Sequence, residues 1–139
     1  MADIALTAAQ IGLVDPVKSQ VESYIAAEAI TKGQAVYITT TGTAGVADAN
    51  AAGKQQFRGI ALQSVGAGQA VDVCHNGLLY GFTISGLNAD ALAYLSDTAG
   101  ALADAAGTMS VVAGRVKCLT DKAGTKVLRI VVPFSTTWA

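Results

Sequence analysis

Cys74 and His75 are the residues of this chain that most resemble a reactive pair, a thiol next to an imidazole. A thiolate and an imidazole act together only when both side chains lie on the same side of the backbone. The segment around them alternates apolar and polar residues, which predicts a β-strand, and neighbouring residues of a strand point to opposite faces. We therefore expect no reactive pair. His75 is the only histidine, which excludes multi-histidine metal sites, and we expect it at a strand end beside a turn.

The other candidate catalytic residues lack a supporting pattern. Gly66 to Gly68 join two expected strands and open no helix, so they match neither a phosphate loop nor a dinucleotide-binding turn. Ser64 and Ser85 lack the setting of a nucleophile elbow. The acids in or next to expected turns, where Asp bonds its own backbone, are Asp48, Asp72, Asp90, Asp97 and Asp104. A carboxylate pair among them stays open, but no spacing singles one out. We predict a protein that is not an enzyme and holds no cofactor or metal.

Composition sets the outer limits on function. The 139 residues are 52% hydrophobic and 14% charged, and the formal net charge is −1. This balance gives no electrostatic footprint for nucleic acid, and no cluster of Lys and Arg marks a membrane surface. No apolar run approaches the roughly 18 residues of a membrane span, and the start lacks the pattern of a signal peptide. We expect one domain made and folded in a cytoplasm, with Cys74 and Cys118 as reduced, buried thiols.

An internal repeat supplies the elements that would position a site. Tyr37-Ile38 recurs as Tyr94-Leu95, and the segment 46–49 recurs as 102–105. Further matches follow in the same order, separated only by single-residue insertions or deletions. The repeat covers about residues 30–76 and 87–132. Two copies are too few for an open solenoid, so we predict two β modules that share one core.

Each copy consists of short segments with strand periodicity, separated by turn residues. Asn76-Gly77 is a strong hairpin signal, because both residues tolerate the positive φ of a type I′ turn. It predicts a hairpin between a strand that ends at His75 and a strand over 78–84. The other expected strands cover 35–40, 44–48, 57–62, 92–96, 109–119 and 125–133. The predicted fold class is all-β, a small β-barrel or β-tulip-like domain.

Residues 1–24 lie outside the repeat and are expected to form an N-terminal arm, ahead of a β domain over 25–139. Asp15-Pro16 is a favourable helix start with Asp15 as the N-cap, and it predicts a short helix over 16–24. The apolar residues of the N-terminal arm have no period long enough to dock on the domain. They are Ile4, Leu6, Ile11 and Leu13. We expect the arm to be extended and to order only on a partner.

The last expected strand is apolar on both faces. In the aligned copies, Leu128 and Ile130 stand where the first copy has Asp72 and Cys74. Such a strand is covered on both sides, either by the rest of the domain or by another copy of the chain. We assign to a homo-oligomer interface the residues Leu128, Ile130, Val132 and Trp138. The alternative for Trp138 is that it staples the tail to its own core.

Five short motifs occur in a fixed order over about residues 25–133. They run over 29–37, 57–62, 67–71, 93–97 and 114–116. As an ordered set they resemble the small head decoration, or cement, proteins of tailed bacteriophages. The resemblance implies a β domain on the outer surface of the capsid in the virion, synthesised in the bacterial host cytoplasm. It also implies a homotrimer at local three-fold positions that binds the major capsid protein and stabilises the head, without nucleic acid or membrane as a partner.

Within this resemblance we expect the N-terminal arm to attach the domain to the shell. The arm would add a strand to an exposed edge of the capsid protein, with Ile4, Leu6, Ile11 and Leu13 as capsid contacts. The alternative is that the arm covers its own barrel. The alternative function is a carbohydrate- or receptor-binding β domain on a virion or cell surface. That function needs exposed aromatic residues above a groove, and one Trp, four Tyr and three Phe are a thin supply.

Overall fold

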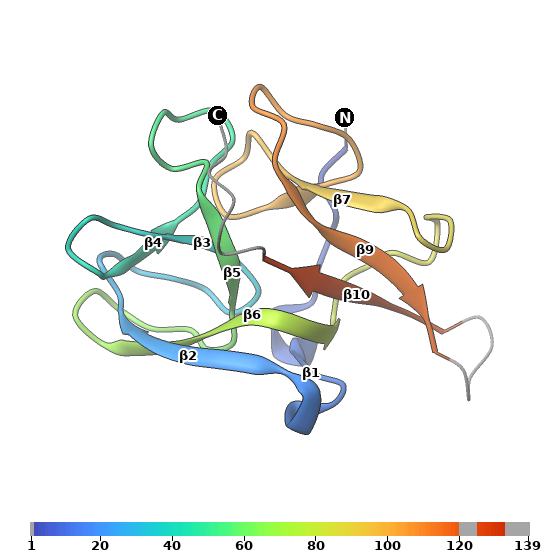
Figure 1. Ribbon diagram of the computed structural model, residues 1–139, viewed down its shortest axis with the longest axis horizontal. Coiled ribbons are helices and arrows are strands. Elements are labelled where there is room, and N and C mark those ends of the chain that lie inside the picture. Colours follow the sequence, from blue (N-terminus) through green and yellow to red (C-terminus); the bar gives the residue numbers. More distant parts are fainter. Residues whose placement is uncertain (1, 120–124, 133–139) are drawn as a thin grey trace.

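Antiparallel β-strands are the main elements of this chain (Figure 1). The computed structural model describes residues 2–119 and 125–132. Two 3₁₀ turns, η1 (Ala8–Gln10) and η2 (Pro16–Lys18), accompany the strands, and no α-helix occurs within the described ranges. The strands are β1 (Gly12–Leu13), β2 (Gln20–Ile25), β3 (Ala35–Ile38), β4 (Ala44–Val46), β5 (Phe57–Ala61), β6 (Ala70–Tyr80), β7 (Leu92–Leu95), β8 (Leu102–Ala103), β9 (Val112–Cys118) and β10 (Lys126–Val131). The all-β prediction is confirmed.

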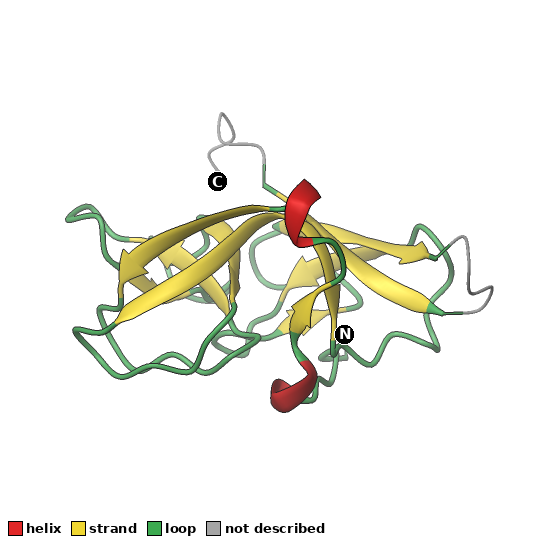
Figure 2. Ribbon diagram, turned by 90° about the horizontal axis from the view of Figure 1, so that it is seen from below, coloured by secondary structure: helices red, strands yellow, loops and turns green. Residues whose placement is uncertain are grey.

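The strands form a curled sheet that resembles half a barrel (Figure 2). Neighbouring strands follow the order β4-β3-β5-β6-β10-β9-β7-β8, and β1 and β2 also pair with β6. All of these strand pairs are antiparallel. The two halves of the sequence therefore meet where β6 pairs with β10.

The same set of strand pairs is built twice. In the first half β3 pairs with β4 and β5, and in the second half β7 pairs with β8 and β9. The register repeats as well. The pair Ala35↔Ile60 corresponds to Leu92↔Arg115, which lies 57 positions later on one strand and 55 on the other. The β3–β5 pair shifts register between Val36 and Tyr37, and the β7–β9 pair shifts at the corresponding place, between Ala93 and Tyr94.

The structural repeat includes β2, which the sequence pattern leaves outside. Val21 of β2 pairs with Cys74 in the N-terminal half of β6. Leu78 in the C-terminal half of β6 pairs with Arg129 of β10. The same displacements of 57 and 55 positions relate these two pairs. β2 is therefore the counterpart of the C-terminal half of β6, and β6 is one continuous strand that ends the first copy and begins the second.

The predicted hairpin at Asn76-Gly77 is wrong, because β6 runs through both residues. At Asn76 it pairs with β2 on one edge and with β10 on the other. The Asn76 side chain reaches both neighbours: Nδ2 donates to Gln20 Oε1 at 2.6 Å, and Oδ1 accepts from the N–H of Val132 at 3.2 Å. Gly77 leaves room for Ser19, whose Oγ would lie 2.6 Å from a Cβ at this position. Pairing on two edges outweighs the local turn preference.

The two halves differ in which faces they bury. In the first half, Val73 belongs to a small apolar cluster on one face, and Cys74 belongs to the main core on the other. In the second half, Leu128 belongs to the main core, whereas the next residue, Arg129, is exposed. The main core draws residues from both halves. The first half is thus covered on both faces and the second half on one.

The predicted oligomer interface is wrong for three of its four residues. Leu128 and Ile130 are completely buried, and Val132 is 3% exposed, all in the main core of their own chain. Trp138 lies outside the described residues. The physical reason is the place of β10 between β6 and β9, where its inner side faces the core.

The misassignment follows from the alignment of the two copies. The registers make Arg129, not Ile130, the counterpart of Cys74. Residues on a strand alternate between faces, so an offset of one residue assigns every side chain of that strand to the wrong face. The true counterpart of Cys74 is therefore the exposed Arg129, whereas Leu128 and Ile130 point into the main core.

The N-terminal arm is docked on its own domain, so the prediction that it lacks an internal partner is wrong. The N–H of Ile4 donates to the carbonyl of Leu102 at 2.7 Å, and β1 pairs with the end of β6. Ile4 and Ile11 are 7% and 2% exposed in the main core, and Leu6 and Leu13 pack against it partly buried. The arm covers its own sheet, because β6 and the β8 region offer it backbone partners and an apolar surface.

The predicted helix over 16–24 is reduced to the single 3₁₀ turn η2. Asp15 caps it, accepting from the N–H of Val17 at 3.2 Å, and Pro16 occupies the first position. The chain then enters β2 instead of continuing the helix. The edge of β6 supplies hydrogen-bond partners there, and the β-branched and aromatic residues of β2 suit a strand.

Gly114 has no space for a side chain, because a Cβ there would overlap the carbonyl oxygen of Arg129 on the neighbouring strand. We expect Gly114→Ala to lower the free energy of unfolding by about 1–3 kcal/mol, since β9 must move away from β10 to relieve the overlap. Gly86→Ala is the matched control, because nothing lies within 4 Å of its added Cβ. Its effect should stay within about 0.5 kcal/mol. Urea titrations of both variants measure this, and equal midpoints would contradict the close approach.

Ile11 fills the space beside two glycines, Gly33 and Gly81, that have no Cβ to compete with it. We expect Ile11→Ala to destabilise the protein by about 2–5 kcal/mol, because it leaves a cavity in the main core. The control Val17→Ala, at a residue 94% exposed, should change stability by no more than about 0.5 kcal/mol. The measurement is the urea midpoint. Small effects in both variants would show that the arm contributes no core packing.

Candidate functional site

Cys74 and His75 are both buried, but they lie on opposite faces of β6 and form no thiol–imidazole pair. Cys74 lies in the main core, and burial raises the pKa of its thiol to about 11. A protonated thiol is a poor nucleophile at neutral pH. Cys118 is also free, but it is only partly buried. His75 faces Tyr24 of β2 from within the strand, so the prediction that it ends a strand beside a turn is wrong.

His75 is the centre of a hydrogen-bonded cluster that joins β2, β5 and β6. Its Nδ1 lies 2.5 Å from the carbonyl oxygen of Arg58, and its Nε2 lies 2.9 Å from the hydroxyl of Tyr24. The Tyr24 hydroxyl is also 3.0 Å from Oε2 of Glu22. Burial, followed by the hydrogen bond to Glu22 and its negative charge, raises the pKa of Tyr24 to about 12, while Arg58 acts in the opposite direction. The phenol therefore stays protonated at neutral pH.

The partners of His75 decide the direction of one of these hydrogen bonds. The Arg58 carbonyl can only accept, so Nδ1 of His75 carries a hydrogen. The Tyr24 hydroxyl donates to Oε2 of Glu22 and also lies within hydrogen-bond distance of Nε2 of His75. These contacts hold β2 against β6.

The His75 cluster is not a complete catalytic constellation. The imidazole is 1% exposed, which leaves a substrate no access to it. The hydroxyl of Ser23 on β2 donates to Asp72 at 2.5 Å, so it belongs to a separate pair. Within the described residues, no group of three or more His, Cys, Asp and Glu could hold a metal. The geometry fits a tie between strands.

Two of the acidic residues that the sequence places at turns accept hydrogen bonds from backbone N–H groups. Asp97 accepts from the N–H and the hydroxyl of Thr108 at 2.7 and 2.9 Å, and Asp48 accepts from the N–H of Asn50 at 2.8 Å. The bond of Asp48 is the local turn bond that the sequence predicts, whereas Asp97 joins two segments that lie 11 positions apart. Asp72 differs, because it lies within β6.

The outer edge of β2 has no partner strand at residues 21–23 in the part of the chain that the structure describes. Directly after β2, Ala26 forms a parallel bridge with Ala44 of β4, and the N–H of Ala27 donates to the carbonyl of Ala44 at 2.7 Å. The other edge of β2 pairs with β6. The N–H of Ala26 donates to Gln69 at 2.8 Å, which turns the even-numbered residues toward β6. The backbone groups of Val21 and Ser23 therefore point outward without a partner strand, while those of Ile25 lie next to the bridge between Ala26 and Ala44. Val21 and Ile25 are 38% and 49% exposed, and β2 lies at the margin of the sheet (Figure 1).

In the second copy, the edge that corresponds to the outer edge of β2 is covered by a strand. The C-terminal half of β6 is the counterpart of β2, and it carries β1 on its outer edge. Leu13 pairs with Leu79, and the N–H of Val14 donates to the carbonyl of Leu78 at 2.9 Å. The corresponding positions on β2 are residues 21–23. No strand of the described chain lies on their outer edge.

The predicted capsid contacts do not form an exposed site. Ile4 and Ile11 are buried, and Leu6 and Leu13 are partly buried against the same core. Sequence reasoning missed the outer edge of β2, because apolar residues with helical spacing in this region suggested a helix. The usable signal was the β-branched and aromatic content of 20–25. The residues missed are Val21, Ser23 and Ile25.

Comparison with known proteins adds no family to this geometry. No family model, no curated protein and no solved structure matches the chain. In the ranges that the structure describes, no helix has the length and apolar character needed to cross a membrane. The surfaces of the molecule are therefore what indicates its function.

The raised pKa of Tyr24 predicts a loss of stability at high pH. Its folded pKa is about 12, above the ordinary value of 10.0, so folding favours the neutral phenol. The stabilisation is complete below about pH 10 and is lost as the pH rises through about 12. We expect the stability difference between wild type and Tyr24→Phe to shrink over this interval. Urea midpoints of both proteins from pH 9 to 12 measure it, and parallel curves would contradict the assignment.

Proposed function

We propose that this chain is a structural protein of a bacteriophage head, which binds the outer capsid surface and stabilises the lattice. The ordered motifs and the small all-β fold support this proposal. The described residues that could do chemistry are buried or bonded in separate local pairs, which suits a protein that binds without catalysis. The proposed partner is the major capsid protein. A homo-oligomer, with a trimer favoured by the resemblance, is part of the same proposal.

The observation that carries the proposal is the outer edge of β2. An exposed edge can accept a strand from another protein, with main-chain hydrogen bonds for affinity and side-chain pockets for specificity. The matching edge of the second copy carries β1, so this fold already accepts a strand at that place. Val21 and Ile25 add exposed apolar side chains beside the edge. Attachment by strand addition thus remains the proposed mode, with β2 as the acceptor instead of the N-terminal arm as the donor.

A preformed edge lowers the cost of binding. Ordering a free arm costs on the order of 1 kcal/mol or more per residue. β2 is already held by β6 and by the His75 cluster, so most of that cost falls on the partner strand alone. Several edges on one oligomer would also act together, because linked sites raise the effective concentration of each other.

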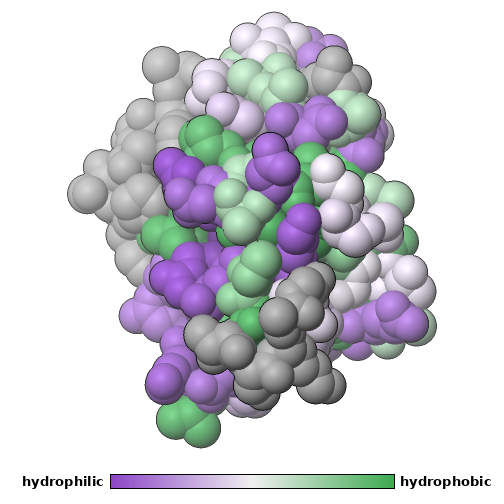
Figure 3. Space-filling model, turned by 90° about the vertical axis from the view of Figure 1, so that its right-hand side faces the viewer, coloured by the Kyte–Doolittle hydropathy of each residue, from purple (hydrophilic) through white to green (hydrophobic). Residues whose placement is uncertain are grey.

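A carbohydrate- or receptor-binding function has less support. Among the described residues, the large apolar side chains that are exposed include one aromatic side chain, that of Tyr80, which is 44% exposed. Hydrophilic and hydrophobic residues are interspersed on the side of the molecule seen in Figure 3. Neither observation supplies a row of aromatic rings above a groove.

The proposal predicts that charge beside the β2 edge weakens decoration. We expect Val21→Lys combined with Ile25→Lys to lower the affinity for heads at least about tenfold, or about 1.4 kcal/mol, because apolar anchors are lost and charges would be buried. The measurement is co-sedimentation with heads assembled without this protein, followed by electron microscopy of their occupancy.

Ala52→Lys combined with Ala106→Lys is the matched control, because it adds the same charge at two exposed loop positions. It should decorate heads like the wild type. Unchanged decoration by the β2 variant would exclude this edge as the contact. Failure of the wild-type protein to bind heads would overturn the proposed function itself.

A further inference from the structure

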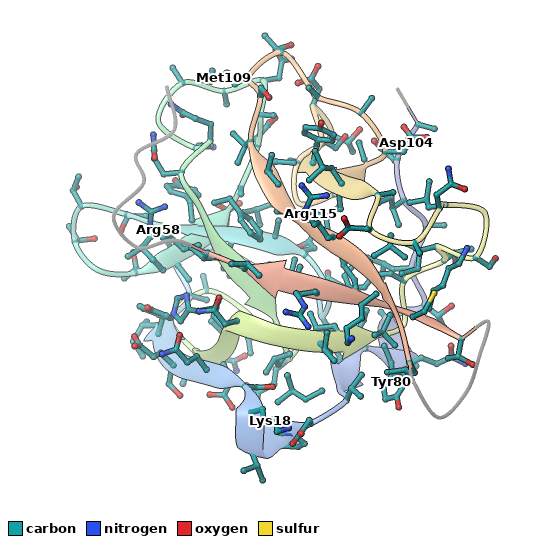
Figure 4. The ribbon with its side chains drawn as sticks, turned by 45° about the vertical axis from the view of Figure 1, so that its right-hand side comes forward. Lys18, Arg58, Tyr80, Asp104, Met109 and Arg115 are labelled. Atoms are coloured by element: carbon teal, nitrogen blue, oxygen red, sulfur yellow. The ribbon has the colours of Figure 1, made fainter. Side chains whose placement is uncertain are left out.

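A cleft with three basic residues lies on the outer face of the second copy. It has a volume of about 460 Å³, and β6 and β10 form its floor. Lys18 of η2 lines one side and Lys117 of β9 the other, with Arg129 of β10 between them. In Figure 4, Lys18 and Arg115 lie on either side of β6 and β10. We call this surface the basic cleft.

Two of the three cations of the basic cleft, Lys117 and Arg129, belong to the second copy, and Arg115 beside the cleft belongs to it as well. The counterparts of Arg115, Lys117 and Arg129 in the first copy are Ile60, Leu62 and Cys74, each 55 positions earlier. The first-copy face is buried, so apolar residues fit there. The second-copy face is exposed, which requires polar residues but not positive ones. All three replacements are nevertheless cationic.

The cations of the basic cleft are not compensated within the described chain. Lys18, Lys117 and Arg129 make no ion pair or side-chain hydrogen bond among these residues. Arg129 also lies directly opposite Arg115 across the β9–β10 pair, an arrangement of like charges that destabilises a sheet. Asp90 lies 3.4 Å from Arg115. The positive charge of the cleft is therefore available to an anionic partner.

The lining of the cleft favours a carboxylate-bearing polypeptide over a nucleic acid. Leu78 and Val131 give it an apolar floor, which suits hydrocarbon side chains and not phosphate groups. The lining contains no aromatic ring on which a base could stack. The chain also has a net charge of −1, whereas binding along a nucleic acid needs an extended basic surface. One acid, Asp15, lies among the three cations and leaves the cleft net positive.

We propose that the basic cleft binds an extended, acidic segment of a partner protein. Its carboxylates pair with Lys18 on one side and with Lys117 and Arg129 on the other, and an apolar side chain between them packs on Leu78 and Val131. This site is separate from the outer edge of β2. The inference therefore does not depend on the proposed attachment to a capsid.

Titration calorimetry with the full chain tests the proposal. The probe is a peptide of about eight residues that alternates glutamate and valine. Its controls are the same peptide with glutamine in place of glutamate, and an oligothymidylate of equal charge. We expect the acidic peptide to bind, with an affinity that falls as salt rises, and the glutamine peptide not to bind.

The variants assign the binding to the cleft. Lys18→Gln combined with Lys117→Gln should weaken the acidic peptide at least about tenfold. Lys32→Gln combined with Lys54→Gln removes the same charge elsewhere and should leave binding within about twofold. An equal loss of peptide affinity in both double variants would show that the net charge of the protein alone attracts the peptide, and it would overturn the cleft as the binding site. Tighter binding of the oligothymidylate, or no binding of the acidic peptide, would overturn the partner class.

The variant Val21→Lys/Ile25→Lys separates the two proposals. It should bind the acidic peptide as the wild type does, because neither residue lines the basic cleft. Loss of decoration with retained peptide binding would assign the two functions to two surfaces. Loss of peptide binding in this variant would contradict a separate cleft site.

Discussion

The continuous pairing of β6 on both of its edges is the constraint on which the rest of the structure depends. β2 and then β1 occupy one edge, and β5 and then β10 occupy the other. The strand ends the first copy and begins the second without a turn. A hairpin at Asn76-Gly77 would separate the copies and remove the pairing of β10 with β6, so that β10 would keep only β9 as a neighbour. The side chain of Asn76, bonded to both neighbouring strands, holds the strand extended where its local preference is to turn.

The two copies share their pairing but not their surroundings, and the surroundings decide the residue types. Gly59 and Gly114 keep the same role, because a Cβ at either would overlap a carbonyl oxygen on the next strand. Backbone geometry thus requires the same residue in both copies. Cys74 and Arg129 are counterparts with opposite character, because one lies in the main core and the other faces solvent. Burial, not strand pairing, accounts for the divergence of these positions.

Local pattern was enough to predict most strands and the all-β class. The turn after Ile38 and the cap at Asp15 were also predictable, since both depend on residues close in sequence. The failures all concern partners that are distant in the chain. The sequence cannot show that β6 has neighbours on both edges, that Ile11 has a place beside Gly81, or that the second copy aligns one residue differently. Each of these depends on which segment lies opposite, and a one-residue offset reverses the faces of a strand.

The duplication explains why the outer edge of β2 stays open at residues 21–23, ahead of the bridge from Ala26 to β4. Each copy begins with a strand whose outer edge needs a cover: β2 in the first copy and the C-terminal half of β6 in the second. The described chain contains one short covering strand, β1, and uses it on β6. An open edge invites pairing with other chains, and a charged residue on it disfavours self-association. Glu22, 63% exposed on β2, supplies that charge while it bonds to the Tyr24 hydroxyl. A partner strand that accommodates this carboxylate would complete the first copy in the way that β1 completes the second.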